Sequence, residues 1–190
     1  PLDSIKFNTR VTVALANGHG QRALDILTAA EKASRRPLVQ GQSSRAIALA
    51  MLGRIDEANQ ELDALDPAGR RDTYHVARVI VGRAQGRSPS DIHAVVSRID
   101  RTQDKYRQWR VAETVEAAHA GNRAEANRLA SEMDARPGGP FLLAVLSTIC
   151  HCGSPFDLAA TPNSQARSAE PGLRWPPPAT SAYPPRAPDR

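Results

Sequence analysis

Apolar residues recur along this chain with the spacing of amphipathic helices. Within 46–67, AIALAMLGRIDEANQELDALDP, they return every three to four positions on either side of Gly53, with polar residues between them. This spacing predicts two helices joined by a glycine turn, each with one apolar side. Helices of about a dozen residues are marginal alone in water, and Pro67 ends the second one. The unit is therefore expected to pack against neighbours on both sides.

The same unit recurs through most of the chain. Its turn glycines are separated by 35, 33 and 35 residues: Gly18, Gly53, Gly86 and Gly121. Alanine stands five positions after three of them: Ala23, Ala58 and Ala126. A small residue at this place lets the second helix of a unit approach the first closely. Asp91 occupies it in the third unit, where Ser88 as N-cap and Pro89 in the first turn predict that the helix begins later.

A unit of about 34 residues with glycine at the turn, alanine at a fixed offset and proline after the second helix resembles the tetratricopeptide repeat (TPR). The resemblance covers residues 2–137, although most aromatic residues that the family favours in the first helix are replaced. Phe7 fits, whereas three other residues stand at the equivalent places: Gln42, His75 and Arg110. The resemblance implies an all-α fold, an α-solenoid of about four TPR-like repeats. We place them at 2–36, 38–67, 72–103 and 105–137.

Two further segments follow the repeats. The apolar run at 140–152 predicts a capping helix that covers the last repeat, so that the helical domain spans 1–152. Residues 153–190 are rich in Pro, Ser and Ala, which predicts an extended tail. The tail also contains Phe156, Leu158 and Trp175, and its FDLAATPN and GLRWPPP runs are similar to the closing segment of some bacterial TPR proteins. We expect part of it to dock on the last helices.

Composition and charge narrow the classes of function. Hydrophobic residues make up 41% of the 190 residues and aromatic residues only 4%, so packing falls to Ala, Leu, Val and Ile. The net charge of +5 comes from arginines scattered among carboxylates over the whole chain. Nucleic-acid binding calls for clustered basic residues with stacking aromatics. The pattern therefore predicts a solvated surface and no nucleic-acid partner.

The sequence also predicts where the protein resides in the cell. The longest apolar run, 141–150, is about half of what a bilayer span needs, and no signal segment is visible. Two cysteines give no disulfide framework and fit a reducing compartment, so we expect a cytoplasmic location. The chain enters a helical pattern almost at Pro1, which suggests a fragment of a longer protein.

Catalytic and metal motifs are weak in this sequence. Cys150, His151 and Cys152 are potential ligands of a soft metal, but three adjacent residues cannot close a tetrahedral site. No nucleophile elbow and no glycine-rich phosphate loop is present. We therefore predict no catalytic residues, no metal and no cofactor, and hence no enzyme.

One row of charged residues suggests a binding site. The position eight residues before each turn glycine holds Arg10, Arg45, Arg78 and Glu113. Equivalent positions of a solenoid align, and the first helices of TPR repeats line the inner surface. Guanidinium groups bind carboxylates bidentately, so this arginine row would suit an acidic peptide. Alternatively, these side chains lie at the edge of the apolar stripe or pair with acids of the neighbouring repeat.

The resulting hypothesis is a non-catalytic protein–protein interaction module that binds a peptide or helix of a partner in its concave groove. The alternative is a regulatory or oligomerisation arm of a larger bacterial signalling protein. A metal-dependent or nucleic-acid-binding protein is a third interpretation. The identity of the partner, the pathway and the oligomeric state stay open at this point.

Overall fold

The computed structural model describes residues 2–34, 39–65, 72–99, 108–137, 139, 143 and 156–168. Within these residues the chain forms nine α-helices and one 3-10 helix, and no strand, so the prediction of an all-α chain is confirmed. The elements are α1 (Leu2–Ala16), α2 (Gly20–Ser34), α3 (Val39–Met51), α4 (Ile55–Leu65), α5 (Asp72–Ala84), α6 (Pro89–Val96), α7 (Gln108–His119), α8 (Arg123–Asp134), η1 (Leu158–Ala160) and α10 (Pro162–Ser168).

The first eight helices form four pairs, and each pair turns at a predicted glycine. The turn glycines have φ angles of 74°, 73°, 77° and 75° in chain order. Each donates its N–H to the carbonyl three residues earlier, and the next residue donates to the carbonyl five residues before itself, as His19 does to Ala14 over 2.9 Å. This left-handed helix ending strains any residue that carries a Cβ. One local requirement therefore recurs four times along the chain.

The third turn is one residue longer, as the sequence predicts. The Ser88 hydroxyl accepts a hydrogen bond from the Asp91 N–H, and the Asp91 carboxylate accepts one from the Ser88 N–H, so α6 begins at Pro89. Ile92 then takes the buried place that alanine holds in the other pairs. A Cβ on Gly82 would lie 2.9 Å from the Ile92 Cδ1 atom. Gly82 therefore provides on α5 the space that a small residue provides on the second helix elsewhere.

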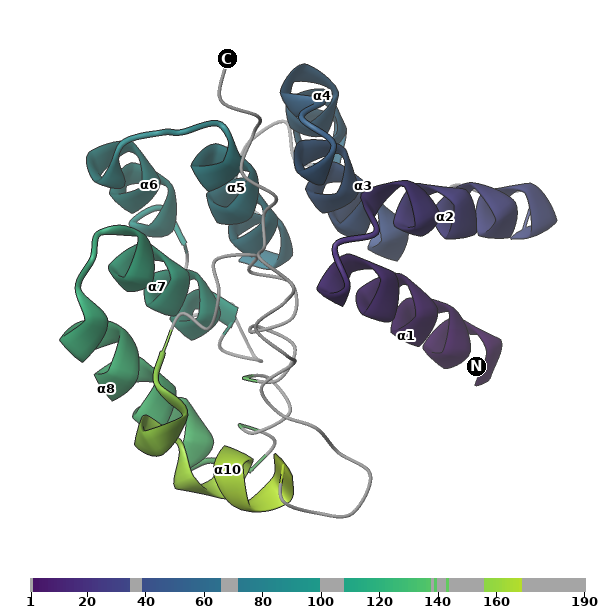
Figure 1. Ribbon diagram of the computed structural model, residues 1–190. Coiled ribbons are helices and arrows are strands. Elements are labelled where there is room, and N and C mark those ends of the chain that lie inside the picture. The colour runs from purple at the N-terminus through teal and green to yellow at the C-terminus, as the bar shows by residue number, and fades with distance from the viewer. Residues whose placement is uncertain are drawn as a thin grey trace.

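Successive pairs pack against one another in chain order. Helix α3 contacts α1 and α2, α5 contacts α3 and α4, and α7 contacts α5 and α6. Figure 1 shows the pairs following a curve, with α1, α3, α5 and α7 on its inner side and α2, α4, α6 and α8 on its outer side. One core cluster runs through all four pairs and includes Leu15, Leu49, Ile80 and Val115.

Residues 156–168, here called the end segment, lie against the last pair. Both η1 and α10 contact α8 (Figure 1), and Phe156 is buried in the main core cluster, as is Leu143. The Asp134 carboxylate, at the end of α8, accepts hydrogen bonds from the backbone N–H groups of Asn163 and Ser164 at 2.7 and 2.8 Å. It thereby satisfies orphan donors in the first turn of α10. Most of the predicted capping helix, and Trp175, lie outside the described residues.

Candidate partner-binding surface

Two members of the arginine row are paired within the chain. Arg45 of α3 forms an ion pair with Glu31 of α2 and lies 3.8 Å from a carboxylate oxygen of Glu61 on α4. Arg78 of α5 contacts Asp63 of α4 at 3.0 Å and donates to the Leu62 carbonyl at 3.1 Å. Both guanidinium groups therefore bridge a first helix to the second helix of the preceding pair. An acidic ligand would have to compete with these carboxylates.

The other two members of the row behave differently. Arg10 of α1 is exposed and makes no hydrogen bond or ion pair with any described residue. Glu113 pairs with Arg110 of its own helix at 3.1 Å. The contact between α6 and α7 is instead bridged by His93 and Glu116, whose ring nitrogen and carboxylate oxygen are 2.5 Å apart. The row does not form one continuous free surface, and the partner-binding role of its four residues stays a prediction.

The inner side of the curve carries different residues. A helix turns by about 100° per residue, so side chains two positions from Arg45 and Arg78 project almost oppositely to them. On α3 these are Ser43 and Ile47, and on α5 they are Val76 and Ile80. On α7, the same count from Glu113 gives Val111 and Val115. The inner side is therefore mixed on α3 and apolar on α5 and α7.

The charged positions singled out in the sequence did not point to a second row of residues on this inner side. It stands six positions before each turn glycine: Thr12, Ile47, Ile80 and Val115. Ile47, Ile80 and Val115 are buried in the main core cluster, to which Leu143 also belongs. Thr12 is only half-buried. The apolar inner row is thus covered, and its signal in the sequence was a repeated β-branched residue at a fixed offset from the turn.

Arg83 is a charged residue close to the apolar inner side of α5. It lies three residues after Ile80 on α5, about 60° around the helix from that residue. Its side chain is half-buried, and its Nη1 atom is buried without a hydrogen-bond partner. Burial lowers the pKa of Arg83 from its ordinary value, and no described carboxylate opposes this shift. A guanidinium in such surroundings gains from any anion that reaches it.

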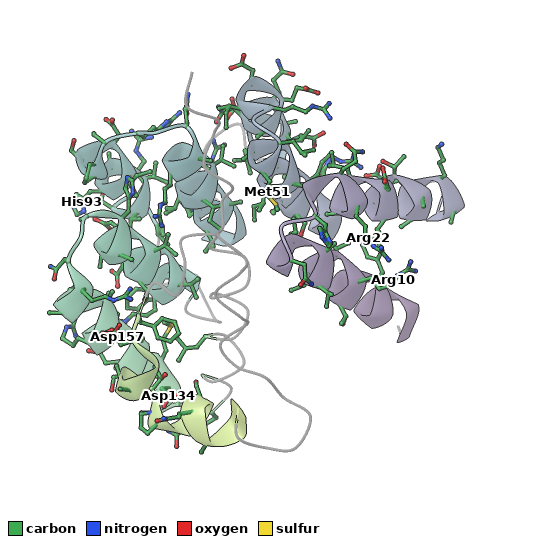
Figure 2. The ribbon with its side chains drawn as sticks, viewed as in Figure 1. Arg10, Arg22, Met51, His93, Asp134 and Asp157 are labelled. Atoms are coloured by element: carbon green, nitrogen blue, oxygen red, sulfur yellow. The ribbon has the colours of Figure 1, made fainter. Side chains whose placement is uncertain are left out.

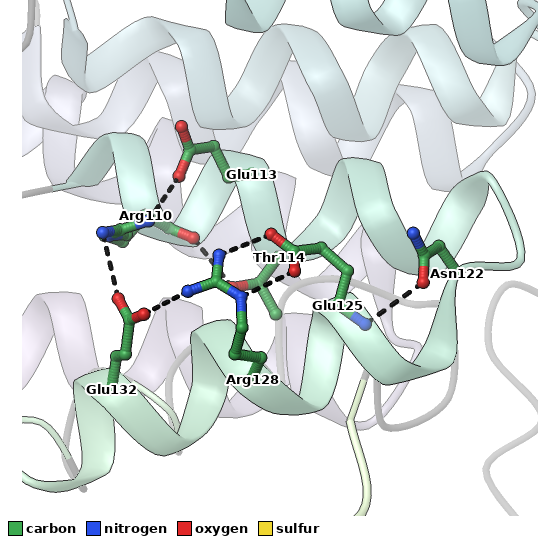
Figure 3. Close-up of polar contacts among 7 residues, drawn as sticks. All are labelled: Arg110, Glu113, Thr114, Asn122, Glu125, Arg128 and Glu132. Atoms are coloured by element: carbon green, nitrogen blue, oxygen red, sulfur yellow. Dashed lines mark hydrogen bonds and ion pairs between the residues drawn. The ribbon is translucent and has the colours of Figure 1, made fainter.

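A network of charged residues connects α7 and α8, although the Nε atom of Arg110 is buried without a hydrogen-bond partner. Figure 3 shows Arg110 between Glu113 and Glu132, and Arg128 between Glu125 and Glu132. Arg128 donates to both carboxylate oxygens of Glu125 at 2.6 and 2.7 Å, and this hydrogen bonding lowers the pKa of Glu125. The network pairs two guanidinium groups with three carboxylates. We assign the network to the packing of α8 on α7.

Other features give no catalytic arrangement in the part of the chain that the structure describes. A shallow hollow of about 370 Å³ on one side of α6 is lined by Arg87, Asp91, Ala94, Val95 and Arg98. Asp91 already caps α6 there. No group of three or more His, Cys, Asp or Glu residues gathers as metal ligands among the described residues, and the Cys150–Cys152 cluster lies outside them. No described helix combines the length and apolar character that crossing a bilayer requires.

The chain matches no protein-family model, no curated protein and no solved structure.

Proposed function

We propose that the chain is a TPR-like α-solenoid of four helix pairs that binds a peptide or helix of a partner protein along the inner side of its curve, without catalysis. The repeated glycine turn and the packing of each pair on the next support this proposal. In such an array the first helices lie side by side, so a ligand can contact several of them at once.

The observation that carries the proposal is Arg83 beside the apolar inner row. A half-buried guanidinium without a carboxylate is unfavourable in the unliganded chain, because its desolvation is not compensated. Ile80 and Val115 supply apolar contact on α5 and α7. A ligand with one carboxylate beside one or two apolar side chains matches this combination. The partner segment is therefore acidic and amphipathic, and the arginine row retains the structural contacts described above.

The spacing of the helices sets the length of the ligand. Neighbouring packed helices are about 10 Å apart, so reaching from α3 to α7 covers about 20 Å. An extended chain advances about 3.3 Å per residue, which gives about six residues. A ligand of this length contacts three first helices and one guanidinium. It must also replace the contacts by which the inner row is now buried.

Peptide selection tests the proposed function. The full chain is immobilised and used to select from a display library of random peptides about ten residues long. Affinities of selected peptides are then measured by fluorescence anisotropy. We expect enrichment of peptides that combine Asp or Glu with Leu, Ile, Val or Phe. Arg83→Glu should weaken their binding about tenfold or more, because it replaces an attraction by a repulsion.

The matched control is Arg98→Glu, which makes the same charge change at an exposed position in the turn after α6. It should bind the selected peptides as the parent does, and circular dichroism should show equal helix content in both variants. Selection of peptides without acidic residues, or equal loss of binding in the two variants, would contradict the proposal.

The alternative function, a regulatory or oligomerisation arm of a larger assembly, has one observation in its favour. Val13 of α1 is 53% exposed, whereas the equivalent residues of α3 and α5, Ala48 and Val81, are buried.

A further inference from the structure

The polar contacts that join successive helix pairs differ in one chemical respect. At the first two contacts, an arginine of a first helix, Arg45 or Arg78, pairs with a carboxylate of the preceding pair. Between the third and fourth pairs, His93 of α6 (Figure 2) pairs with Glu116 of α7 instead. A guanidinium stays charged at any ordinary pH, whereas an imidazole changes its charge between about pH 5 and 8. The contact of α6 with α7, here called the histidine junction, therefore contains a group that titrates near neutral pH.

Protonation strengthens the contact between His93 and Glu116 without moving either side chain. The Nδ1 atom of His93 lies 2.5 Å from a carboxylate oxygen of Glu116. A neutral imidazole with its proton on Nδ1 donates a hydrogen bond to that oxygen, and an imidazolium adds the attraction between two opposite charges. The Glu116 side chain is only 18% exposed, so solvent screens the pair less than a fully exposed one. The imidazole of His93 is 68% exposed and exchanges its proton with water directly.

A second histidine joins the same two pairs. His119, in the last turn of α7, donates from Nε2 to the Arg87 carbonyl in the turn between α5 and α6, over 3.0 Å. An imidazolium keeps this donor. Its positive charge is also favoured at the C-terminal end of a helix, and Glu116 stands three positions earlier on the same side of α7. Both histidine contacts are therefore retained or strengthened when the imidazoles are protonated.

The other charged groups around the junction keep their charge in this pH range. They belong to α5, α6, α7 and the turn between α5 and α6: Arg78, Arg83, Arg87, Asp91, Arg110 and Glu113. Carboxyl groups titrate at about pH 4 and arginines above about pH 12, so neither changes between about pH 5.5 and 7.5. The remaining histidines are His19 in the first turn, His75 buried on α5, and His151 outside the described residues. A charge on buried His75 would act on the core as a whole, which the variants below separate from the junction.

We propose that the histidine junction is a pH-dependent clamp, which holds α6 on α7 when His93 is protonated and loosens when His93 is neutral. Helix α5 also packs on α7, so the change is confined to the side of the junction that α6 forms. The clamp does not rest on peptide binding by the inner side, because it concerns the contact of one helix pair with the next. Its ligand is the proton, and the group that rewards binding of the proton is the Glu116 carboxylate.

Amide hydrogen exchange of the full chain tests the clamp, because it measures how often a helix opens. Exchange is followed by mass spectrometry at about pH 5.5 and about pH 7.5, with labelling times corrected for the intrinsic dependence of exchange on pH. The protection of α6 is divided by that of α3, whose only charged residue is Arg45. We expect this ratio to be about twofold to fivefold higher at the lower pH, as for an ion pair near the surface.

Three variants assign the effect to the junction. His93→Arg supplies the permanent charge that arginine supplies at the other two contacts, so the ratio should stay high at both pH values. His93→Gln can donate a hydrogen bond but carries no charge, so the ratio should stay low at both. His19→Gln is the matched control, because it makes the same substitution at an exposed imidazole of the first turn, and it should behave as the parent does. A parent ratio that does not change with pH, or a pH dependence that persists in His93→Gln, would overturn the proposal.

Discussion

The two ends of the helix array differ in how their apolar and charged side chains are covered. At the α8 end, Phe156 is 1% exposed and the Asp134 carboxylate holds the start of α10, so the last pair is closed by the chain itself. At the α1 end, Val13 and Arg10 face solvent although their counterparts on α3 and α5 are buried and paired. An array of this kind is stable only where each apolar side finds a neighbour. The two ends of the array therefore differ in how far their apolar and charged side chains are covered.

The strongest test of the comparison removes the large side chain at the closed end. Phe156→Ala should lower the free energy of unfolding by about 3 to 5 kcal/mol, because it deletes a buried aromatic side chain and leaves a cavity. Val13→Ala at the open end should change it by less than about 0.5 kcal/mol, since an exposed residue loses few contacts. Urea unfolding followed by circular dichroism measures both. Equal effects would mean that the two ends do not differ.

A second test addresses the hydrogen bonds of the closed end. Asp134→Asn keeps the size of a buried side chain but removes its charge and leaves an amide N–H₂ group facing backbone donors. It should cost about 1.5 to 3 kcal/mol at neutral pH. Asp25→Asn is the matched control, because Asp25 is exposed and, within the described ranges, accepts a hydrogen bond from Gln21 alone, at 2.9 Å. An unchanged melting temperature in Asp134→Asn would show that the end segment is not held through this carboxylate.

A third test compares equivalent arginines along the array. Arg78→Ala should cost about 1 kcal/mol, because its half-buried guanidinium pairs with Asp63 and donates to a backbone carbonyl. Arg10→Ala should cost nothing measurable in the isolated chain, since Arg10 has no described partner. Thermal unfolding at low salt gives both values. If Arg10→Ala is as destabilising as Arg78→Ala, then Arg10 makes a stabilising contact in the isolated chain.

The smallest expected effect concerns pH at the closed end. Hydrogen bonding from the Asn127 amide, helped by Arg123 at 3.0 Å, holds the pKa of Asp157 below its ordinary value. A carboxyl with a lowered folded-state pKa contributes stability above its unfolded pKa of about 4, and this contribution disappears as pH falls through the lower folded value. The stability difference between parent and Asp157→Asn should therefore be constant near neutral pH and shrink below about pH 4. A difference that grows on acidification would contradict this assignment.

Much of the local structure could be predicted from the sequence. The turn glycines need a positive φ, which is a property of single residues, and Ser88 with Asp91 predicted the late start of α6 from capping chemistry alone. These features depend on a few neighbouring residues, so no tertiary information was required. The all-α fold followed from them and from the period of the apolar residues.

The candidate surfaces needed the tertiary structure. Counting from the turn glycine placed Arg10, Arg45 and Arg78 at one offset but did not say which side of the helix they occupy. That side is set by the preceding pair, whose Glu31 and Asp63 are 14 and 15 positions away in sequence. Whether Arg83 has a carboxylate beside it, and whether Val13 has a helix over it, likewise depends on contacts between separate helices. The sequence by itself determined where the four helix pairs turn, because a glycine turn is a local choice, whereas η1 and α10 lie in a segment for which its composition predicted an extended tail. Only the packing of one pair on the next decided which arginines form ion pairs and which apolar side chains of α1 stay exposed.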